Sequence, residues 1–229
     1  MTIRHIAACA AFVVLAVCVS PRAIAGTEED ERARNAVRVL DEIMQAPDKR
    51  VPDALLARAE AIAVIPDVVK AGFVVGGRRG KGLLAVRGAD GTWSNASFVT
   101  LTGGSVGFQA GVQSTDVLLV FRTRRGVDSV VNGKFTLGAD ASVAAGPVGR
   151  NANASTDAQL KAEIYSYSRS RGLFAGVAFD GAVLAIDHDA NRGAYGENVT
   201  PRRVFEGGAP AQSDPVVEFR DRLEEYTAN

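Results

Sequence analysis

The chain has 229 residues, of which 47% are hydrophobic and 23% are charged, with 26 basic against 26 acidic side chains. This length suits one medium-sized domain, and the composition argues against a mostly disordered, collagen-like or multi-pass membrane protein. A formal net charge of zero lacks the basic excess usual in DNA- or RNA-binding proteins, so no nucleic-acid partner is expected.

Residues 1–25 have the three-part pattern of a secretory signal peptide. Arg4 precedes an apolar run from Ile6 to Val19, and Ala23 to Ala25 supply small residues at the expected cleavage site. The apolar run is shorter than the ~20 residues that a membrane span needs. We therefore expect an exported protein, periplasmic or secreted, that is cleaved after residue 25.

Both cysteines, Cys9 and Cys18, lie in this segment. Processing as a lipoprotein at Cys18 is an alternative, since Leu15 to Cys18 resembles a lipobox, but Val17 is bulkier than the small residue expected there. After cleavage the chain has no disulfide, no cysteine nucleophile and no cysteine-based metal site. We expect neither a metal nor a cofactor.

The mature chain begins with predicted helices. Thr27 and the acidic residues after it are typical of a helix N-terminus, and apolar residues recur at helical spacing from Ala33 to Met44. Charged residues, Arg32 among them, occupy the opposite face. Ala46-Pro47 is expected to end this helix, and a second short helix is predicted from Pro52.

From Ile62 to Gly149 the sequence changes to short β-branched and aromatic runs separated by glycines. Glycines inside strand patterns indicate bends or close backbone approach, as expected of a strongly curved sheet or barrel. A helical turn is predicted at 126–131. Strands are predicted at 73–75, 83–86, 97–101, 105–112, 117–121 and 134–143.

Further strands are predicted after residue 160. The alternation from Tyr165 to Arg171 is that of a strand, and 173–179 and 182–186 are predicted to form a hairpin around Asp180-Gly181. Residues 201–213 are expected to be a linker, and a helix from Asp214 is expected to pack on a domain spanning 26–200. The predicted fold class is α+β, a curved, mainly antiparallel sheet or barrel-like core flanked by N- and C-terminal helices.

Two clusters are candidate phosphate-binding sites. In the first, Lys70 precedes the run from Gly76 to Gly82, whose glycines would expose backbone N–H groups while Arg78, Arg79 and Lys81 supply charge. We interpret this run as a glycine-bearing turn that binds an anion, and a solvated hairpin turn is the alternative. It is not a Walker loop, because Gly82 stands where that motif needs Ser or Thr.

The second cluster is the alternating segment after Ile164. Tyr165, Tyr167, Arg169 and Arg171 would share one strand face, with neighbouring guanidinium groups ~6.6 Å apart along the strand. Two guanidinium groups at that spacing could bind phosphate, with help from the tyrosine hydroxyls. The alternative is that the tyrosines pack inward and the arginines bond to backbone or acidic groups.

No catalytic residues are predicted. His188 is the only histidine after residue 25, and no Gly-x-Ser-x-Gly motif occurs, which disfavours a serine hydrolase. Asp187, Asp189 and Asn191 match the first half of a calcium loop, but Arg192 replaces its glycine, so a capped turn is favoured.

Three stretches, AIAVIPDVVKAGFVVGGRRGKGLLAVR (61–87), GADASVAAGPVGR (138–150) and AEIYSYSRSRGLFAGVAFDGAVL (162–184), resemble the SYLF family. The resemblance runs from about Arg34 to Gly196. It implies a domain that binds phospholipid or phosphoinositide head groups, in a family that includes yeast actin-patch proteins and bacterial exported members. Actin binding and bundling belong to the fungal relatives, and an exported bacterial member is not expected to meet actin.

These patterns together predict a non-enzymatic, exported protein of the cell envelope that binds anionic phospholipid, or an anionic membrane surface, through basic residues on glycine-rich turns. Two alternatives stay open. One is an envelope scaffold whose N-terminal helix docks onto a protein partner, and the other is a carrier holding an acyl chain inside the curved sheet. The residues predicted to bind the head group are Lys70, Arg78, Arg79, Lys81, Tyr165, Tyr167, Arg169 and Arg171.

Overall fold

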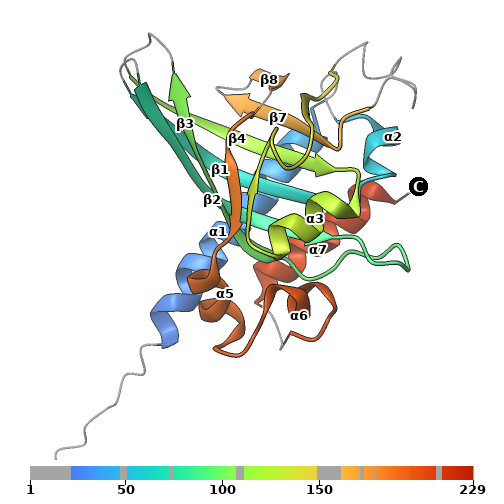
Figure 1. The fold of residues 1–229 in the computed structure, drawn as a ribbon. Coiled ribbons are helices and arrows are strands. Elements are labelled where there is room, and N and C mark those ends of the chain that lie inside the picture. Colours follow the sequence, from blue (N-terminus) through green and yellow to red (C-terminus); the bar gives the residue numbers. More distant parts are fainter. Residues whose placement is uncertain are drawn as a thin grey trace, which may run out of the picture.

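A computed structural model describes residues 22–46, 51–72, 75–106, 111–148, 161–170, 173–177, 179–209 and 213–228. Most of the expected signal peptide, and Arg171, lie outside these residues. Among the helices described, none is both long enough and apolar enough to cross a bilayer. The elements are α1 (Arg22–Met44), α2 (Asp53–Leu56), β1 (Ala61–Gly72), β2 (Val75–Val86), β3 (Ser97–Val106), β4 (Gly111–Phe121), α3 (Arg124–Val131), β5 (Lys134–Thr136), β6 (Val143–Ala145), β7 (Ile164–Ser170), β8 (Leu173–Gly176), β9 (Val183–Ile186), α5 (His188–Tyr195), α6 (Pro201–Phe205) and α7 (Asp214–Thr227) (Figure 1).

The strands form one curled sheet. Their order across the described residues is β5-β9-β3-β2-β1-β4-β7-β6, with β8 paired to β7. All pairs are antiparallel except β6 with β7. Phe135 on β5 and Phe121 on β4 stand far apart in this order, yet their ring centroids are 6.3 Å apart. The sheet therefore curls around these rings, which confirms the predicted α+β fold with a curved, mainly antiparallel sheet.

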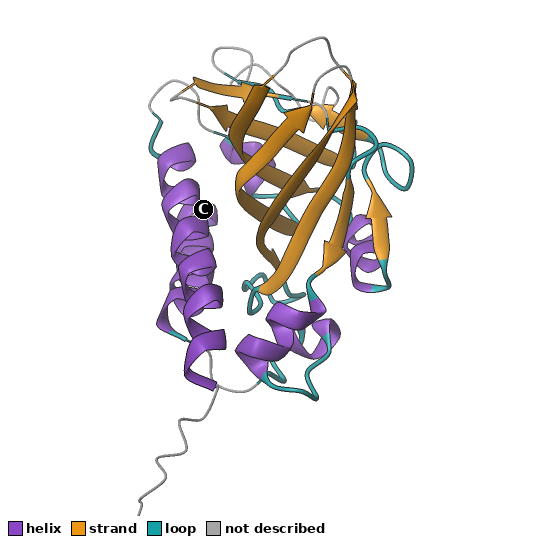
Figure 2. Ribbon diagram, turned by 90° about the vertical axis from the view of Figure 1, so that its left-hand side faces the viewer, coloured by secondary structure: helices purple, strands orange, loops and turns teal. Residues whose placement is uncertain are grey.

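The two faces of the sheet pack against different helices. On the concave face, Val127 and Val130 of α3 belong to the same buried cluster as the sheet residues Phe121 and Phe135. On the convex face α1 and α7 lie side by side, as Figure 2 shows. Both faces of the central strands are therefore buried.

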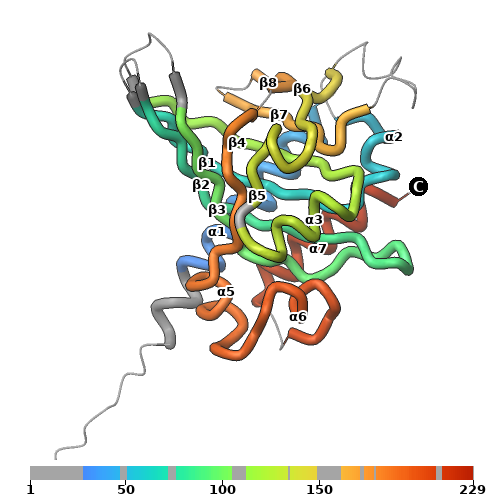
Figure 3. The backbone as a smooth tube through the Cα atoms, viewed as in Figure 1, coloured from blue at the N-terminus to red at the C-terminus, as the bar shows by residue number. Residues whose placement is uncertain are grey.

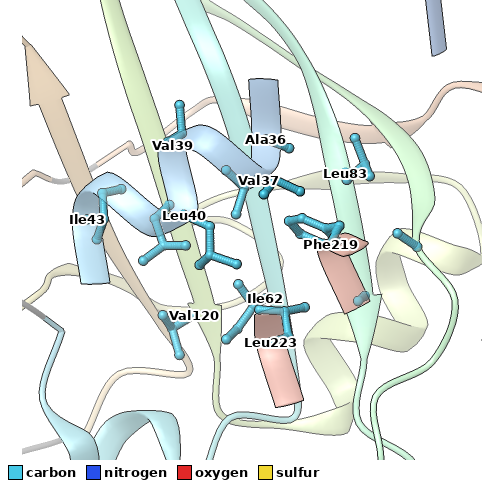
Figure 4. Packing of buried hydrophobic residues seen from close by; sticks show 14 of the residues in the cluster. Ala36, Val37, Val39, Leu40, Ile43, Ile62, Leu83, Val120, Phe219 and Leu223 are labelled. Atoms are coloured by element: carbon cyan, nitrogen blue, oxygen red, sulfur yellow. The ribbon is translucent and has the colours of Figure 1, made fainter. Parts of the chain in front are cut away.

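The predicted apolar stripe of α1 packs on the convex face. Figure 4 shows Leu40 and its neighbours on α1 above Ile62 and Val120 of the sheet, beside Phe219 and Leu223 of α7. All five of these side chains are fully buried. The stripe is thus part of the core of this chain.

The glycine-rich run 76–82 is not a turn but the first part of strand β2, which corrects the prediction. A β-carbon at Gly82 would lie 2.1 Å from the backbone oxygen of Val64, and one at Gly80 would lie 2.7 Å from side-chain carbons of Ile65 and Val68. The register of β1 against β2 shifts between Val64 and Val69. The glycines at 80 and 82 therefore allow β2 to pass close to this bulge.

Other elements also differ from the expectations. Helix α1 begins at Arg22, before the predicted start at Thr27, and β1 was not predicted as a separate strand. Asp180-Gly181 is a turn with Gly181 at φ 73°, but it joins no hairpin, because β8 pairs with β7 while β9 pairs with β3 and β5. Within the expected linker, residues 201–205 form α6 and bury Val204.

Candidate functional site

The basic residues of β2 are divided between the two faces of the sheet. Arg79 and Lys81 alternate with Arg78 along the strand, so they face opposite sides. Arg79 and Lys81 lie toward α1, whereas the Arg78 guanidinium stacks over the Phe179 ring of the concave cluster, 5.3 Å from its centroid. The three cations therefore do not surround one anion, as the predicted turn would have required.

On the concave side, Arg78 has a second cation directly opposite. Lys70 of β1 is its cross-strand partner, and the β-carbons of such partners are about 4.5–5.5 Å apart. Like charges in this position destabilise a sheet. No described acidic group forms an ion pair with either residue, and the buried Nε of Arg78 has no hydrogen-bond partner.

On the helix side, β1 and β2 form a groove with the N-terminal part of α1. Its volume is about 430 Å³. Lys81 donates a hydrogen bond to Glu28 at 2.8 Å, and this bond, with the charge of Lys81, lowers the pKa of the Glu28 carboxyl. Arg79 lies in the same groove without an acidic partner among the described residues. The lining residues are Glu28, Glu31, Arg32, Asn35, Pro66, Asp67, Val69, Arg79, Gly80 and Lys81.

Arg32, expected on the polar face of α1, is buried with 7% of its surface exposed. Its guanidinium donates to Asp187, the N-cap of α5, at 2.9 Å and lies 5.4 Å from the centroid of the Phe98 ring. Burial alone would raise the pKa of Asp187, but hydrogen bonds from Arg32 and the Ala190 N–H outweigh it, and the pKa is lowered. The Asp187 turn thus anchors α1, the structural role favoured over calcium binding.

The second predicted cluster lies mostly in the core. Tyr165 and Tyr167 on β7 are 4% and 0% exposed, and Tyr167 stacks on Phe174 with centroids 5.2 Å apart and planes at 5°. Burial raises the pKa of the Tyr167 hydroxyl. Arg169 forms ion pairs with Glu42 of α1 and, at 3.7 Å, with Asp116 of β4. The inward-packing alternative therefore describes this face, and Arg171 falls outside the described residues.

The two clusters do not converge. Lys81 pairs with Glu28 and Arg169 pairs with Glu42, both on α1. At 1.5 Å per residue, these two acidic residues are about 21 Å apart along the helix. One head group cannot contact both cations.

Three cations that have no acidic partner among the described residues lie together at one end of the sheet. We call this end the sheet tip and define it by described residues at the ends of β1 to β4: 69–71, 76–79, 102–104 and 112–114. It carries Lys70, Arg78 and Arg79 and has no acidic residue. In Figure 3 it projects away from the end of the molecule formed by α5 and α6. The sequence suggested these three cations, but not that they face both sides of a strand end.

Comparison with known proteins shows which family the chain is similar to. Residues 102–226 match the Ysc84 family, described as "Las17-binding protein actin regulator". LAS seventeen-binding protein 3 of Saccharomyces cerevisiae is 38% identical over 174 residues, which cover 74% of this chain and 38% of the yeast protein. The human SH3 domain-containing YSC84-like protein 1 is 33% identical over 205 residues, covering 86% of this chain and 60% of the human protein.

An SH3 domain-containing protein of Schizosaccharomyces pombe is 42% identical over 171 residues, covering 72% of this chain and 40% of its own length. The chain thus spans less than two thirds of each of these relatives. The matches confirm the resemblance to the SYLF family that the three sequence stretches carry.

Proposed function

This chain belongs to the Ysc84 family, and from that premise and the geometry of the sheet tip we propose that it binds anionic phospholipid head groups, without catalysis, through Lys70, Arg78 and Arg79. The site differs from the predicted one in two respects. It is the end of a strand pair and not a turn. Of the predicted residues, the buried tyrosines of β7 and the ion-paired Lys81 and Arg169 take no part in it.

The observation that carries this proposal is the pairing of Lys70 with Arg78. Two cations face each other across adjacent strands, and no described carboxylate neutralises them. A phosphate bound between them would replace a repulsive contact with two charge-assisted hydrogen bonds. Arg79, on the other side of β2, would contact a neighbouring head group.

The setting that we propose for this activity is the cell envelope. The signal-like pattern of residues 1–25 supports export, and a domain that leaves the cytoplasm meets lipid head groups at membrane surfaces. Expression with and without residues 1–25, followed by fractionation and N-terminal sequencing, tests this part. An N-terminus at Gly26 supports cleavage after Ala25, one at Cys18 supports the lipoprotein alternative, and an uncleaved cytoplasmic protein contradicts export.

Liposome co-sedimentation tests head-group binding. Vesicles containing a phosphatidylinositol phosphate, or phosphatidylglycerol, are compared with neutral phosphatidylcholine vesicles. Each basic residue near an anionic surface contributes about 1 kcal/mol, so Lys70→Ala with Arg78→Ala should weaken binding to anionic vesicles by roughly 30-fold. Binding should also weaken as salt is raised, because the attraction is screened.

The matched control is Arg220→Ala with Arg222→Ala. It removes the same charge from α7, where both arginines form ion pairs with acidic residues. It should leave vesicle binding nearly unchanged. Equal binding by the tip variant and the wild type, with both folded, would remove the sheet tip from the mechanism.

A second candidate function is binding of a protein partner, because the family description and the yeast relative's name both refer to Las17 binding. The apolar stripe of α1 cannot serve as the docking surface in this fold, since Leu40 and Ile43 are fully buried. A partner would have to use another surface. Hydrogen exchange with and without a candidate partner would locate it, and protection confined to residues 27–46 would contradict the packing of α1.

The carrier alternative is less well supported. Phe121, Phe135 and Leu184 are fully buried on the concave face, where an acyl chain would have to lie. Native mass spectrometry of the purified protein tests it directly, because a carrier would retain one lipid per chain.

A further inference from the structure

We infer that the sheet tip is the part of the molecule that enters an anionic bilayer, end-on, with apolar side chains in the interface and cations at the head groups. This inference rests on the proposed function and deepens it, because it names the membrane itself, and not a free head group, as what the site recognises.

The first observation is where the exposed apolar side chains lie. Among the described residues, the large hydrophobic side chains that are exposed are Val69 at 42%, Val112 at 76% and Leu173 at 68%. Val69 and Val112 belong to the sheet tip. Leu173 begins β8, opposite Ser170 of β7, and the Ser170 hydroxyl donates to the backbone oxygen of Ser114 at 3.2 Å. All three therefore lie at or beside the same end of the sheet.

The second observation is that two of these side chains, Val69 and Val112, share a face. Val112 is the cross-strand partner of Ala71, and Val69 is the partner of Ser114 and of Arg79. Partners in an antiparallel pair point to the same side, so Val69, Ala71 and Val112 form one exposed apolar strip with Arg79 at its border. Lys70 and Arg78 point to the opposite side. The strand ends that carry the strip thus have cations on both faces of the sheet, with Arg79 beside the strip and Lys70 and Arg78 behind it.

The third observation is the absence of acidic residues. The sequence has no Asp or Glu from 68 to 89 or from 91 to 115, which includes the whole sheet tip. The nearest acidic residues border the tip from outside: Asp67 accepts a hydrogen bond from Ser114, and Glu28 and Glu31 line the groove beside Arg79. An apolar strip whose own strand ends carry cations and no acid is complementary to the acyl–head-group boundary of an anionic membrane. The tip also projects from the fold (Figure 1), as a surface that enters a bilayer must. These features favour a membrane over an acidic protein groove as the occupant.

Fluorescence at a single labelled position tests the inference. In the full chain with Cys9→Ser and Cys18→Ser, a cysteine is introduced by Val112→Cys or, as the control, by Glu218→Cys on the exposed side of α7. Each variant carries an environment-sensitive fluorophore and is mixed with phosphatidylglycerol-containing vesicles. We expect a blue shift, and quenching by brominated lipid, at position 112 and neither at position 218.

A second variant separates insertion from head-group binding. Val69→Asn with Val112→Asn keeps every cation, so binding of a soluble inositol phosphate should be unchanged while vesicle binding falls about tenfold or more. The far-ultraviolet circular dichroism and the fluorescence of the single tryptophan, Trp93, verify that the variant is folded.

The outcomes distinguish the two claims. If the wild type fails to bind anionic vesicles, the proposed function and the inference both fall. If it binds and needs Lys70 and Arg78, but the label at 112 stays in water and the asparagine variant binds vesicles like wild type, head-group binding stands and insertion is refuted. A label at 112 that shifts only with an acidic protein and not with vesicles would assign the tip to a protein partner instead.

Discussion

Replacing Arg32 with Met should loosen α1 from the rest of the fold. Arg32 is 7% exposed, donates to Asp187 at 2.9 Å and lies over the Phe98 ring. Methionine fills similar space but leaves the Asp187 carboxylate, whose side chain is 15% exposed, without its cation. Removing one partner of a buried ion pair typically costs 3–5 kcal/mol. Because Asp187 keeps some solvent and its hydrogen bond from the Ala190 N–H, we expect a loss of about 2–4 kcal/mol in the free energy of unfolding.

Urea unfolding followed by Trp93 fluorescence measures this loss, since Trp93 is the only tryptophan and is 3% exposed. A double-mutant cycle with Asp187→Asn isolates the pair, because asparagine can still cap α5. The combined variant should lose less than the sum of the single losses. A loss below about 1 kcal/mol for Arg32→Met, or strictly additive losses, would refute the claim that this pair anchors the helix.

The Arg32–Asp187 ion pair should make the free energy of unfolding depend on pH. The pKa of Asp187 is lower in the folded chain than its ordinary value, near 3.9 in the unfolded chain. Its stabilisation is therefore fully present above that unfolded value and is lost as the pH falls through the lower folded pKa. Arg32→Met should reduce this acid-dependent part of the stability. If Arg32→Met and the wild type showed the same slope of unfolding free energy against pH below about 4, Arg32 would not be what lowers the pKa of Asp187.

Two further changes test the packing of the sheet. Gly82→Ala should lower the free energy of unfolding by more than about 2 kcal/mol, because the new carbon would meet the backbone of Val64 at 2.1 Å; Gly104→Ala, with open space around it, should be nearly neutral in the same urea titration. If the Gly82→Ala variant were as stable as the wild type, β2 would not pass as close to β1 as the structure indicates. Tyr167→Ala should cost about 3–5 kcal/mol, whereas Tyr167→Phe should cost less than about 1.5, since its hydroxyl makes only a 3.4 Å bond to the Pro147 oxygen. Equal losses for both would mean that the hydroxyl, and not the ring, matters.

Helices α1 and α7 could be predicted from the sequence because the apolar residues of each recur at helical spacing, whereas α5 was expected as a turn and α6 as part of a linker. The stripe from Ala33 to Met44 and that from Val216 to Leu223 repeat at helical spacing, and the structure buries both. The central strand β1 lacks an equivalent signal. It is covered on both faces, so its apolar run does not alternate with polar residues.

The candidate site was harder to predict, because a residue type does not reveal its neighbours. The run from 76 to 82 has the composition of a phosphate-binding loop, yet Gly80 and Gly82 serve here to let the backbones of β1 and β2 approach each other. Arg32 fits a solvated helix face until the fold brings Asp187, distant in sequence, against it. The alternation of β7 correctly grouped its tyrosines, but it could not indicate whether that face meets solvent or α1.

The strand order has a consequence for how this domain is cut from longer proteins. The family match begins at residue 102, after β1 and β2, which stand between β3 and β4 in the sheet. A fragment limited to the matched residues would begin inside β3 and keep only Thr102 of the β3 residues that pair with β9. It would leave β9 with β5 on one side of a gap, and β4 with β7 and β6 on the other. Its two halves would share no hydrogen-bonded neighbour, so an expression boundary should be drawn upstream of α1.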